Sequence, residues 1–355
     1  MTSVTSFQVN YIQYLDELAN THDSTPDLAR DSESLQAMYR AMVLTRTFDK
    51  KAISLQRTGK LGTYPSSLGQ EAISVAIGSA MKPEDVLLPY YREYGAQFLR
   101  GVKMEEILLY WGGDERGMDY QGPAKDFPIC VPIATHAPHA VGVAYAMKLR
   151  NEKRVAVFVC GDGATSKGDF YEAINAAGLW KLPVVFVVNN NQWAISVRRE
   201  IQTGCETIAQ KAAAAGFAGE QVDGNDIIAV RDRFQQAIDK ARAGEGPTLI
   251  EAITYRLCDH TTADDATRYR SEEEVNLHWQ REPVARLKKY MTMQGFWDEK
   301  KEQALERECA QSVEAAVDIY LNTPPQSVEC IFDYMYETTP HDLAQQRQTL
   351  SKAEQ

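Results

Sequence analysis

Two short segments place polar groups that could bind a charged ligand directly after apolar runs. The first, CGDGATSKGDFYEAINAAGLW (160–180), sets Asp162 between two glycines at the end of the apolar run 154–160. The second, NNNQWAIS, begins at Asn189 where the next apolar run ends. Glycine lets a backbone approach a ligand closely, and the start of a helix offers free N–H groups to a diphosphate. We therefore expect an anion-binding turn at residues 161–164.

An aspartate in such a turn repels a diphosphate unless a cation lies between them. Mg²⁺ is the natural cation, because it takes oxygen ligands from carboxylates, neutral carbonyls and phosphates. Neighbouring parallel strands end at the same edge of a sheet, so the segment after Asn189 should lie beside Asp162. The sequence thus predicts a magnesium site formed by the Asp162 carboxylate, the Asn191 amide oxygen and the Trp193 carbonyl.

Two other phosphate-binding motifs do not fit the chain. A dinucleotide fold requires GxGxxG after its first strand, but residues 161–166 read GDGATS and lack the third glycine. A P-loop requires GxxxxGK followed by Ser or Thr, and no such string occurs. A nucleotide-dependent oxidoreductase is therefore disfavoured, although GDG alone is also typical of an ordinary tight turn.

The elements around these motifs alternate between short apolar runs and helical patterns, which is typical of βαβ units and a parallel sheet covered by helices on both faces. The sequence predicts strands over 154–160, 182–190 and 246–256, and helices over 35–59, 69–81, 169–180, 227–243 and several segments up to 321. We expect an α/β fold with one domain over 33–325 and helical additions at both of its ends. A flexible polar N-terminal arm (1–32) would precede it and a C-terminal tail (326–355) would follow.

Composition restricts the class of protein further. The chain has 355 residues, of which 44% are hydrophobic, so it can form a large core. A net charge of -11 argues against a nucleic-acid-binding surface. No apolar run is long enough to span a bilayer and no secretory signal is recognisable, so we expect no membrane role and a cytoplasmic location. The six cysteines form no CxxC pair, which favours buried free thiols over disulfides or zinc.

Three motifs together resemble a known family. GDG followed by 26 residues and then NN resembles the thiamine-diphosphate-binding motif. PYYREYGAQFLRG (89–101) resembles the Tyr-Arg segment in α subunits of 2-oxoacid dehydrogenase E1 components, and EAITYRLCDHTTADDATRYRSEEEV (251–275) resembles their histidine loop. The similarity runs from about residue 35 to about residue 321. It implies a three-layer, parallel-sheet thiamine-diphosphate-binding fold.

The resemblance also implies roles for individual residues. Mg²⁺ would be held by Asp162, Asn191 and Trp193, and the diphosphate would be approached by Gly161, Gly163 and Ala164 on one side and by Tyr91 and Arg92 on the other. Val131 and Ile133 fall where the family packs against the cofactor's pyrimidine, with ordinary core as the alternative. His260, with a near-neutral pKa, would stabilise intermediates and assist acyl transfer.

Three positions depart from the family pattern. Asn189 stands where some relatives have a cation that contacts the diphosphate, which puts that contact in doubt. Thr261 replaces the regulatory serine of mammalian relatives, and we do not predict its phosphorylation. His136 replaces a glutamine of the potassium-binding segment in branched-chain enzymes, so a potassium site is doubtful.

The implied activity is thiamine-diphosphate-dependent oxidative decarboxylation of pyruvate, with transfer of the acetyl group to the lipoyl group of an E2 acyltransferase. The family's activating glutamate lies on a second domain for which this chain has no room, so an E1 β subunit should complete an α2β2 heterotetramer. Tyr64 and Ser66 are expected to contact the 2-oxoacid, and their polarity favours pyruvate. A branched-chain 2-oxoacid (2-oxoisovalerate) dehydrogenase E1 α subunit and a noncatalytic E1 α-like scaffold remain the alternatives.

Overall fold

All six strands of the central sheet run parallel, in the order β1-β7-β8-β4-β3-β2. The computed structural model describes residues 6–22, 25–333 and 335–353. The strands are β1 (Tyr11–Ile12), β2 (Val86–Leu88), β3 (Ala156–Gly161), β4 (Val184–Asn190), β7 (Ala218–Asp223) and β8 (Thr248–Ile253). A separate antiparallel hairpin joins β5 (Trp193–Ala194) to β6 (Val197–Arg198). The predicted α/β fold with a parallel sheet is confirmed.

The central strands form from runs rich in valine, isoleucine and phenylalanine. Every residue of β4 is buried, as expected for a strand covered by helices on both faces. The three predicted strands are confirmed as β3, β4 and β8, each shorter at one or both ends. Strand β2, which has three residues, and β7, which reads AGEQVD, were missed because neither shows a long apolar run.

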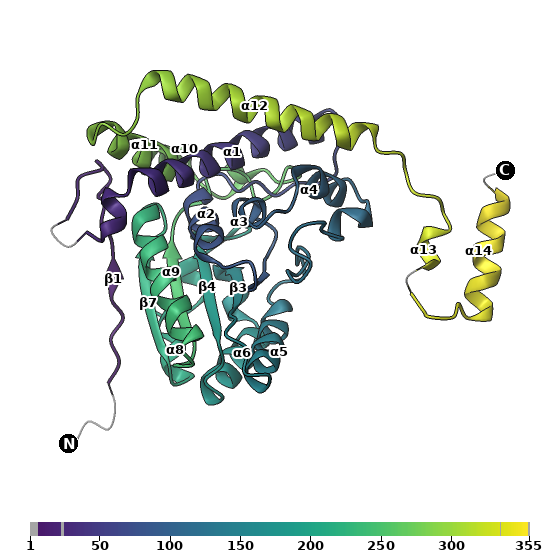
Figure 1. Ribbon diagram of the computed structural model, residues 1–355, viewed down its shortest axis with the longest axis horizontal. Coiled ribbons are helices and arrows are strands. Elements are labelled where there is room, and N and C mark those ends of the chain that lie inside the picture. Colours follow the sequence, from purple (N-terminus) through teal and green to yellow (C-terminus); the bar gives the residue numbers. More distant parts are fainter. Residues whose placement is uncertain (1–5, 23–24, 334, 354–355) are drawn as a thin grey trace.

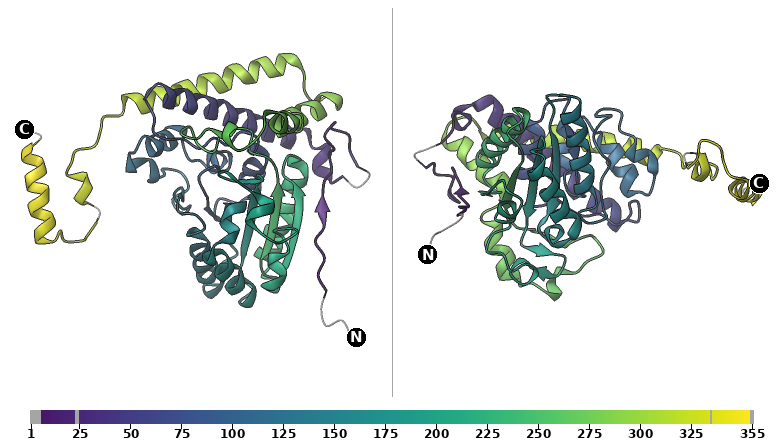
Figure 2. Two further views of the ribbon diagram at one scale, coloured as in Figure 1. Left: turned by 180° about the vertical axis from the view of Figure 1, so that it is seen from behind. Right: turned by 90° about the horizontal axis from the view of Figure 1, so that it is seen from below.

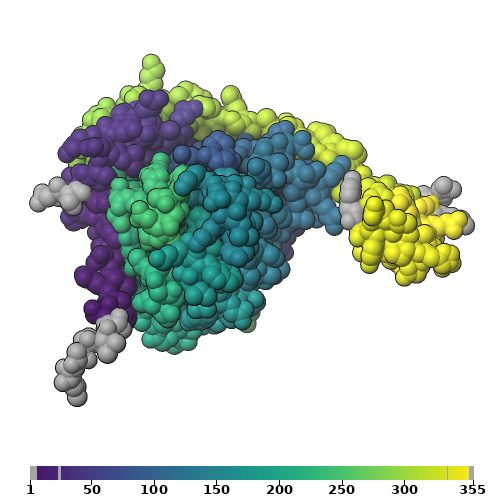
Figure 3. Space-filling model, turned by 60° about the horizontal axis from the view of Figure 1, so that its bottom comes forward, coloured from purple at the N-terminus to yellow at the C-terminus, as the bar shows by residue number. Residues whose placement is uncertain are grey.

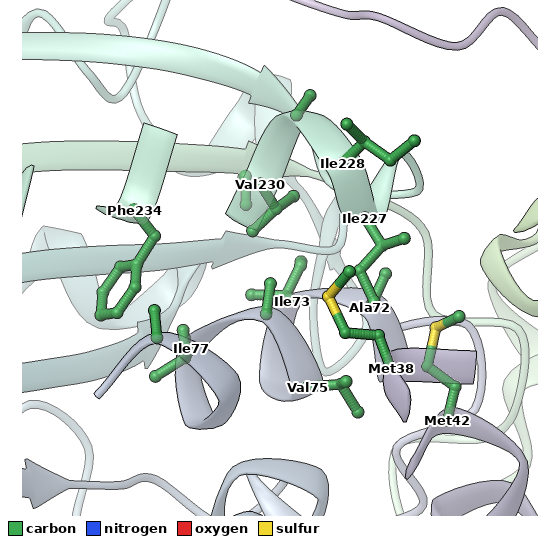
Figure 4. Close-up of a cluster of buried hydrophobic side chains, with 14 of the residues drawn as sticks. Met38, Met42, Ala72, Ile73, Val75, Ile77, Ile227, Ile228, Val230 and Phe234 are labelled. Atoms are coloured by element: carbon green, nitrogen blue, oxygen red, sulfur yellow. The ribbon is translucent and has the colours of Figure 1, made fainter. Parts of the chain in front are cut away.

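Helices cover both faces of the sheet. On one face α2 (Glu71–Ala80) packs against α9 (Ile227–Arg242), and Figure 4 shows Ile73 and Ile77 of α2 close to Val230 and Phe234 of α9. On the other face lie α5 (His136–Leu149), α6 (Gly168–Leu179) and α8 (Lys211–Ala214). Two long helices, α1 (Ser32–Arg57) and α12 (Glu299–Asn322), lie side by side across one end of these layers (Figures 1 and 2). The remaining helices of the globular part are α3 (Tyr94–Leu99), α4 (Met104–Trp111), α7 (Arg199–Gln202), α10 (Glu272–Trp279) and α11 (Pro283–Met293).

The N-terminal segment corrects the expectation of a flexible arm over 1–32. Its strand β1 adds to the edge of the sheet beside β7, and Leu15 is buried in the main core. Oδ2 of Asp226, the residue that caps α9, accepts hydrogen bonds from the backbone N–H groups of Tyr14 (2.6 Å) and Leu15 (2.7 Å). Edge pairing uses backbone atoms, so a polar sequence can dock in this way. Residues 1–5 and 23–24 lie outside the described part of the chain.

The register of β3 and β4 explains the spacing of the two motifs. Gly161 pairs directly with Asn189, so the GDG turn and the segment 189–191 lie side by side at the carboxyl edge of the sheet. Behind the turn, a 3-10 segment (Asp162–Ser166) leads into α6, which begins at Gly168 and confirms the helix predicted over 169–180.

The C-terminal helices α13 (Cys330–Asp333) and α14 (His341–Ala353) stand apart from the layered body, joined to α12 by an extended segment (Figures 1 and 2). In the space-filling view these C-terminal residues, in yellow, lie at one end of the molecule (Figure 3). The boundaries of the proposed domain and tail stay a prediction. Among the described residues, no helix combines the length and apolarity needed to cross a membrane.

Candidate active site

A pocket of about 210 Å³ opens where β3 and β4 end. It brings together ten of the residues singled out from the sequence: Tyr91, Arg92, Ile133, Gly161, Asp162, Gly163, Ala164, Asn191, Trp193 and His260. Three others, Val131, Tyr64 and Ser66, do not line it. The three motifs, which lie up to 169 residues apart (260 minus 91), therefore meet in one cavity.

Asp162 is a buried carboxylate with unused bonding capacity. The side chain is 1% exposed, and its Oδ2 atom has no hydrogen-bond partner among the described residues. Burial raises the pKa of this carboxyl to about 6. A buried, unpartnered carboxylate oxygen costs stability unless a cation or donor binds it. The geometry therefore fits a metal ion at this position.

The neighbouring oxygens suit a hard cation. The Asn191 Nδ2 group donates to Gln70 Oε1 (3.0 Å), while Asn191 Oδ1 accepts a bond from the Trp193 N–H (3.3 Å). The Trp193 carbonyl accepts from Arg256 Nη1 (3.3 Å). Within the described ranges, no group of three or more His, Cys, Asp or Glu side chains could hold a metal. One carboxylate with neutral oxygens is instead a donor set that Mg²⁺ accepts when a phosphate supplies further ligands.

Gly163 is required by close packing. A Cβ atom at this position would lie 2.8 Å from the Ala194 Cβ, so any larger residue would push the β5–β6 hairpin away from the turn.

At the tip of the hairpin, Ile195 has a φ of 55° and lines the pocket. A β-branched residue rarely adopts this conformation, and here the Ile195 carbonyl accepts a bond from Arg256 Nη2 (2.8 Å).

Two guanidinium groups converge on His260. Arg92 Nη2 donates to the His260 carbonyl (2.7 Å) and lies 3.1 Å from His260 Nδ1, while Arg256 Nη1 lies 3.2 Å from the same ring nitrogen. Burial, followed by the charges of Arg92 and Arg256, lowers the His260 pKa to about 3. The expected near-neutral pKa is thus not found in the ligand-free chain. Nδ1 accepts hydrogen bonds, so a neutral ring carries its proton on Nε2.

Tyr91 completes the wall beside Arg92. Its ring lies edge-on to His260 at a centroid distance of 6.1 Å, and the Arg92 guanidinium lies 5.2 Å from its centroid. These contacts hold the Tyr-Arg segment and the histidine loop together in the wall of the pocket.

The two residues expected near the cofactor's pyrimidine ring, Val131 and Ile133, differ in their position relative to the pocket. Ile133 lines it and is 42% exposed, whereas Val131 is 45% exposed and lies outside it. Neither residue belongs to the core, so the ordinary-core alternative is wrong. His136 is buried and lines the pocket; its Nε2 lies 2.8 Å from the Val159 carbonyl, and burial lowers its pKa to about 4.

The structure corrects the expectation for Tyr64 and Ser66. Both side chains are buried, and both hydroxyls donate to the carboxylate of Asp49 rather than to the pocket. Asn189, the position of a possible diphosphate contact, is also buried and does not line the pocket.

Several site residues were missed from the sequence. Arg256, Gln70 and Ile195 all contact predicted ligands or line the pocket, and Glu274 accepts from Trp193 Nε1 (3.3 Å) and Tyr255 Oη (2.9 Å). A cation in the buried strand end ITYR, with no acid beside it, was the one available signal for Arg256. Nothing in the sequence singled out the others.

Comparison with known proteins assigns this chain to a family. A family model described as the dehydrogenase E1 component matches residues 39–329. The chain is 40% identical over 354 residues to a Staphylococcus aureus protein named pyruvate dehydrogenase E1 component subunit alpha, which covers 99% of this chain and 95% of that protein. It is 38% identical over the same coverage to the protein of that name from Staphylococcus epidermidis. The chain therefore belongs to the dehydrogenase E1 component family.

Proposed function

We propose that the chain is the α subunit of a pyruvate dehydrogenase E1 component that binds thiamine diphosphate and Mg²⁺. The observation that carries the proposal is the unpartnered, buried Oδ2 of Asp162, in a pocket that Asn191 and Trp193 also line, in a chain of this family. A carboxylate held in this way is costly in an empty protein and useful when a metal links it to a diphosphate.

The described side chains divide the binding work between two walls. Asp162, Asn191 and the Trp193 carbonyl would hold the metal ion. The backbone of Gly161, Gly163 and Ala164 would lie against the diphosphate. Arg92 and Tyr91 on the facing wall would bind the phosphate oxygens, and a guanidinium suits that task because its planar donors match phosphate geometry.

When bound, thiamine diphosphate supplies the carbanion chemistry that decarboxylates a 2-oxoacid. The chain's own part is orientation, charge and exclusion of water. His260 presents Nε2–H as a hydrogen-bond donor, because Nδ1 faces Arg92 and Arg256. A donor in that place would stabilise negative charge on a substrate carboxylate and would orient an incoming lipoyl group.

A second chain is needed to close the site. The pocket opens beside the exposed apolar side chains of Ile133 and Ile195, a combination typical of a surface that another protein covers. The relatives are named as one subunit of a multi-subunit component. We infer an E1 β subunit, an α2β2 assembly, and acyl transfer to the lipoyl domain of an E2 acyltransferase.

Pyruvate is preferred over a branched-chain 2-oxoacid because the similar proteins are named pyruvate dehydrogenase. Tyr64 and Ser66 no longer support this choice, since their hydroxyls bind Asp49. A noncatalytic scaffold is disfavoured, because His260, which would face the reacting groups, has no evident use in it.

The experiment is a titration of thiamine diphosphate into the chain assembled with its β subunit, with and without Mg²⁺, followed by turnover on pyruvate and on 2-oxoisovalerate. We expect metal-dependent binding and faster turnover of pyruvate. Binding without turnover on either substrate would indicate the scaffold, and faster turnover of 2-oxoisovalerate would indicate the branched-chain enzyme. Tight binding and full turnover by the chain alone would contradict the shared site.

A further inference from the structure

Asp49 on α1 is a buried acid outside the pocket whose hydrogen bonds all go to one loop. It is 1% exposed and forms no ion pair among the described residues. Its Oδ1 accepts from Tyr64 Oη (2.9 Å), the Ser67 N–H (2.8 Å) and Ser67 Oγ (3.3 Å), and its Oδ2 accepts from Ser66 Oγ. The loop 64–67 is thereby fixed to the centre of a long helix.

The backbone of the same loop also contacts Arg92 and the histidine loop (251–275). The Ser66 carbonyl accepts a bond from Arg92 Nη1, the guanidinium that also binds the His260 carbonyl. At the other end of the loop, the Tyr64 carbonyl accepts from the Thr262 N–H (2.9 Å), and the Tyr64 N–H donates to Thr262 Oγ1 (3.0 Å). Asp49 is therefore one loop away from both the arginine and the histidine loop.

The stability of the fold alone does not explain why a carboxylate is buried at position 49. Burial raises its pKa to about 6, and a well-packed apolar side chain at such a position is often no less stable than a buried charge. A carboxylate does what an apolar residue cannot, since it sets the position of several donors at once with short, directional bonds.

We propose that Asp49 is a positioning residue of the active site: its carboxylate fixes loop 64–67 so that Ser66 holds Arg92 and Tyr64 holds the histidine loop. The inference rests on the proposed function, in which Arg92 binds the diphosphate and His260 faces the reacting groups. Asp49 touches neither the pocket nor its ligands, so its effect on binding must travel through the loop.

The test compares Asp49→Asn with Asp226→Asn, both in the chain assembled with its β subunit. Asp226 is the matched control, because it is equally buried, its pKa is also raised to about 6, and it ties the N-terminal segment rather than the site. The readouts are the Kd of thiamine diphosphate with Mg²⁺ and, without cofactor, the rate of tryptic cleavage at exposed Arg268 in the histidine loop.

We expect Asp49→Asn to raise the Kd about tenfold, the order lost when a hydrogen bond to a charged group is removed, and to speed cleavage at Arg268. Asp226→Asn should lower Tm and change neither readout. An unchanged Kd and cleavage rate in Asp49→Asn, or equal changes in Asp226→Asn, would overturn the proposal. If the wild-type complex binds no cofactor, the proposed function fails, while the cleavage comparison still decides the role of Asp49.

Two milder variants keep the proposal testable if Asp49→Asn does not fold. Tyr64→Phe and Ser66→Ala each remove one donor to Asp49 and leave the loop's carbonyls in place. Each should raise the Kd about threefold, because one neutral donor contributes less than the whole set. Wild-type affinity and wild-type cleavage in both variants would overturn the proposal.

Discussion

At the scale of single residues, two of the polar groups that line the pocket are each held in a costly state. Asp162 keeps a buried oxygen without a partner, and His260 is held neutral between two guanidinium groups. Groups whose pKa values are strongly shifted in a pocket are typical of functional sites. For Asp162, the energetic cost should disappear when a metal ion binds or when the carboxylate is removed. For His260, removal of the ring should appear as lost activity.

Replacing Asp162 with Asn should separate stability from binding. The variant removes a desolvated charge, so the free energy of unfolding of the ligand-free chain should rise by about 1–3 kcal/mol. Metal-dependent cofactor binding should be lost. Denaturant titration and a binding titration measure the two effects. Asp226→Asn is the control that should lose stability instead, because all of its hydrogen bonds are made.

The same comparison predicts a pH dependence. In the folded chain the pKa of Asp162 is about 6, above its ordinary value of 3.8, so the folded state binds the proton more tightly. The destabilisation is therefore complete above pH 6 and vanishes below pH 3.8. The stability gap between Asp162→Asn and the wild type should narrow between pH 7 and pH 5. A gap that widens in this range would contradict the buried-charge explanation.

His260→Ala should keep cofactor affinity within about threefold and lower overall turnover with a lipoyl acceptor by about a hundredfold, the range for a lost polar catalytic group.

Because burial, Arg92 and Arg256 lower the His260 pKa to about 3, the ring stays neutral from pH 5 to 8 in the absence of ligand. A proton-exchange or NMR titration of the ligand-free chain should show no His260 transition there. A transition near pH 6.5 that is absent from His260→Ala would show instead that the pKa of His260 is near neutral.

At the scale of elements, the edge strand β1 shows how a polar segment can be part of the core. Its docking relies on backbone pairing with β7, on the Asp226 carboxylate and on one apolar anchor, Leu15. The β5–β6 hairpin is positioned in a comparable way, through Glu274 on α10 and Arg256 beside β8. Short elements of this kind owe their place to contacts with distant segments.

Leu15→Ala should lower the free energy of unfolding by about 2–4 kcal/mol, the usual cost of a buried leucine truncation. The matched control is Leu18→Ala in the same segment, because Leu18 is 62% exposed and its loss should cost less than about 0.5 kcal/mol. Urea denaturation measures both. Equal, small effects would mean that the segment is detached in solution, as its composition suggested.

At the scale of the whole molecule, several apolar side chains beside the pocket are exposed to solvent. Val131, Ile133 and Ile195 are each more than 40% exposed beside the site, and this is the surface that the proposed β subunit would cover. The projecting helices α13 and α14 also carry exposed apolar side chains, including Ile331 and Leu350.

Val131→Asp should weaken assembly with the β subunit by about tenfold or more, since a charge would be buried at the interface. It should leave the Tm of the chain unchanged, because Val131 is exposed. Sedimentation analysis measures the assembly. Ile319→Asp on α12, a similarly exposed position outside the pocket, is the control. Equal effects of the two substitutions would place the interface elsewhere.

The sequence by itself determined the parallel sheet, its three central strands and the meeting of Asp162 with Asn191. These follow from local periodicity and from one geometric fact, that neighbouring parallel strands end at the same edge. Tyr91, Arg92 and His260 were found through resemblance, and the structure brings them to the same pocket.

Only the tertiary structure decided what depends on contacts between distant segments. The low pKa of His260 comes from burial and from two arginines, one of them 168 residues away (260 minus 92). The binding of Tyr64 and Ser66 to Asp49, the exposure of Val131 and the docking of β1 likewise depend on which surfaces meet. Residue type and spacing carry no record of such contacts, because desolvation and hydrogen-bond partners are set only when the chain has folded.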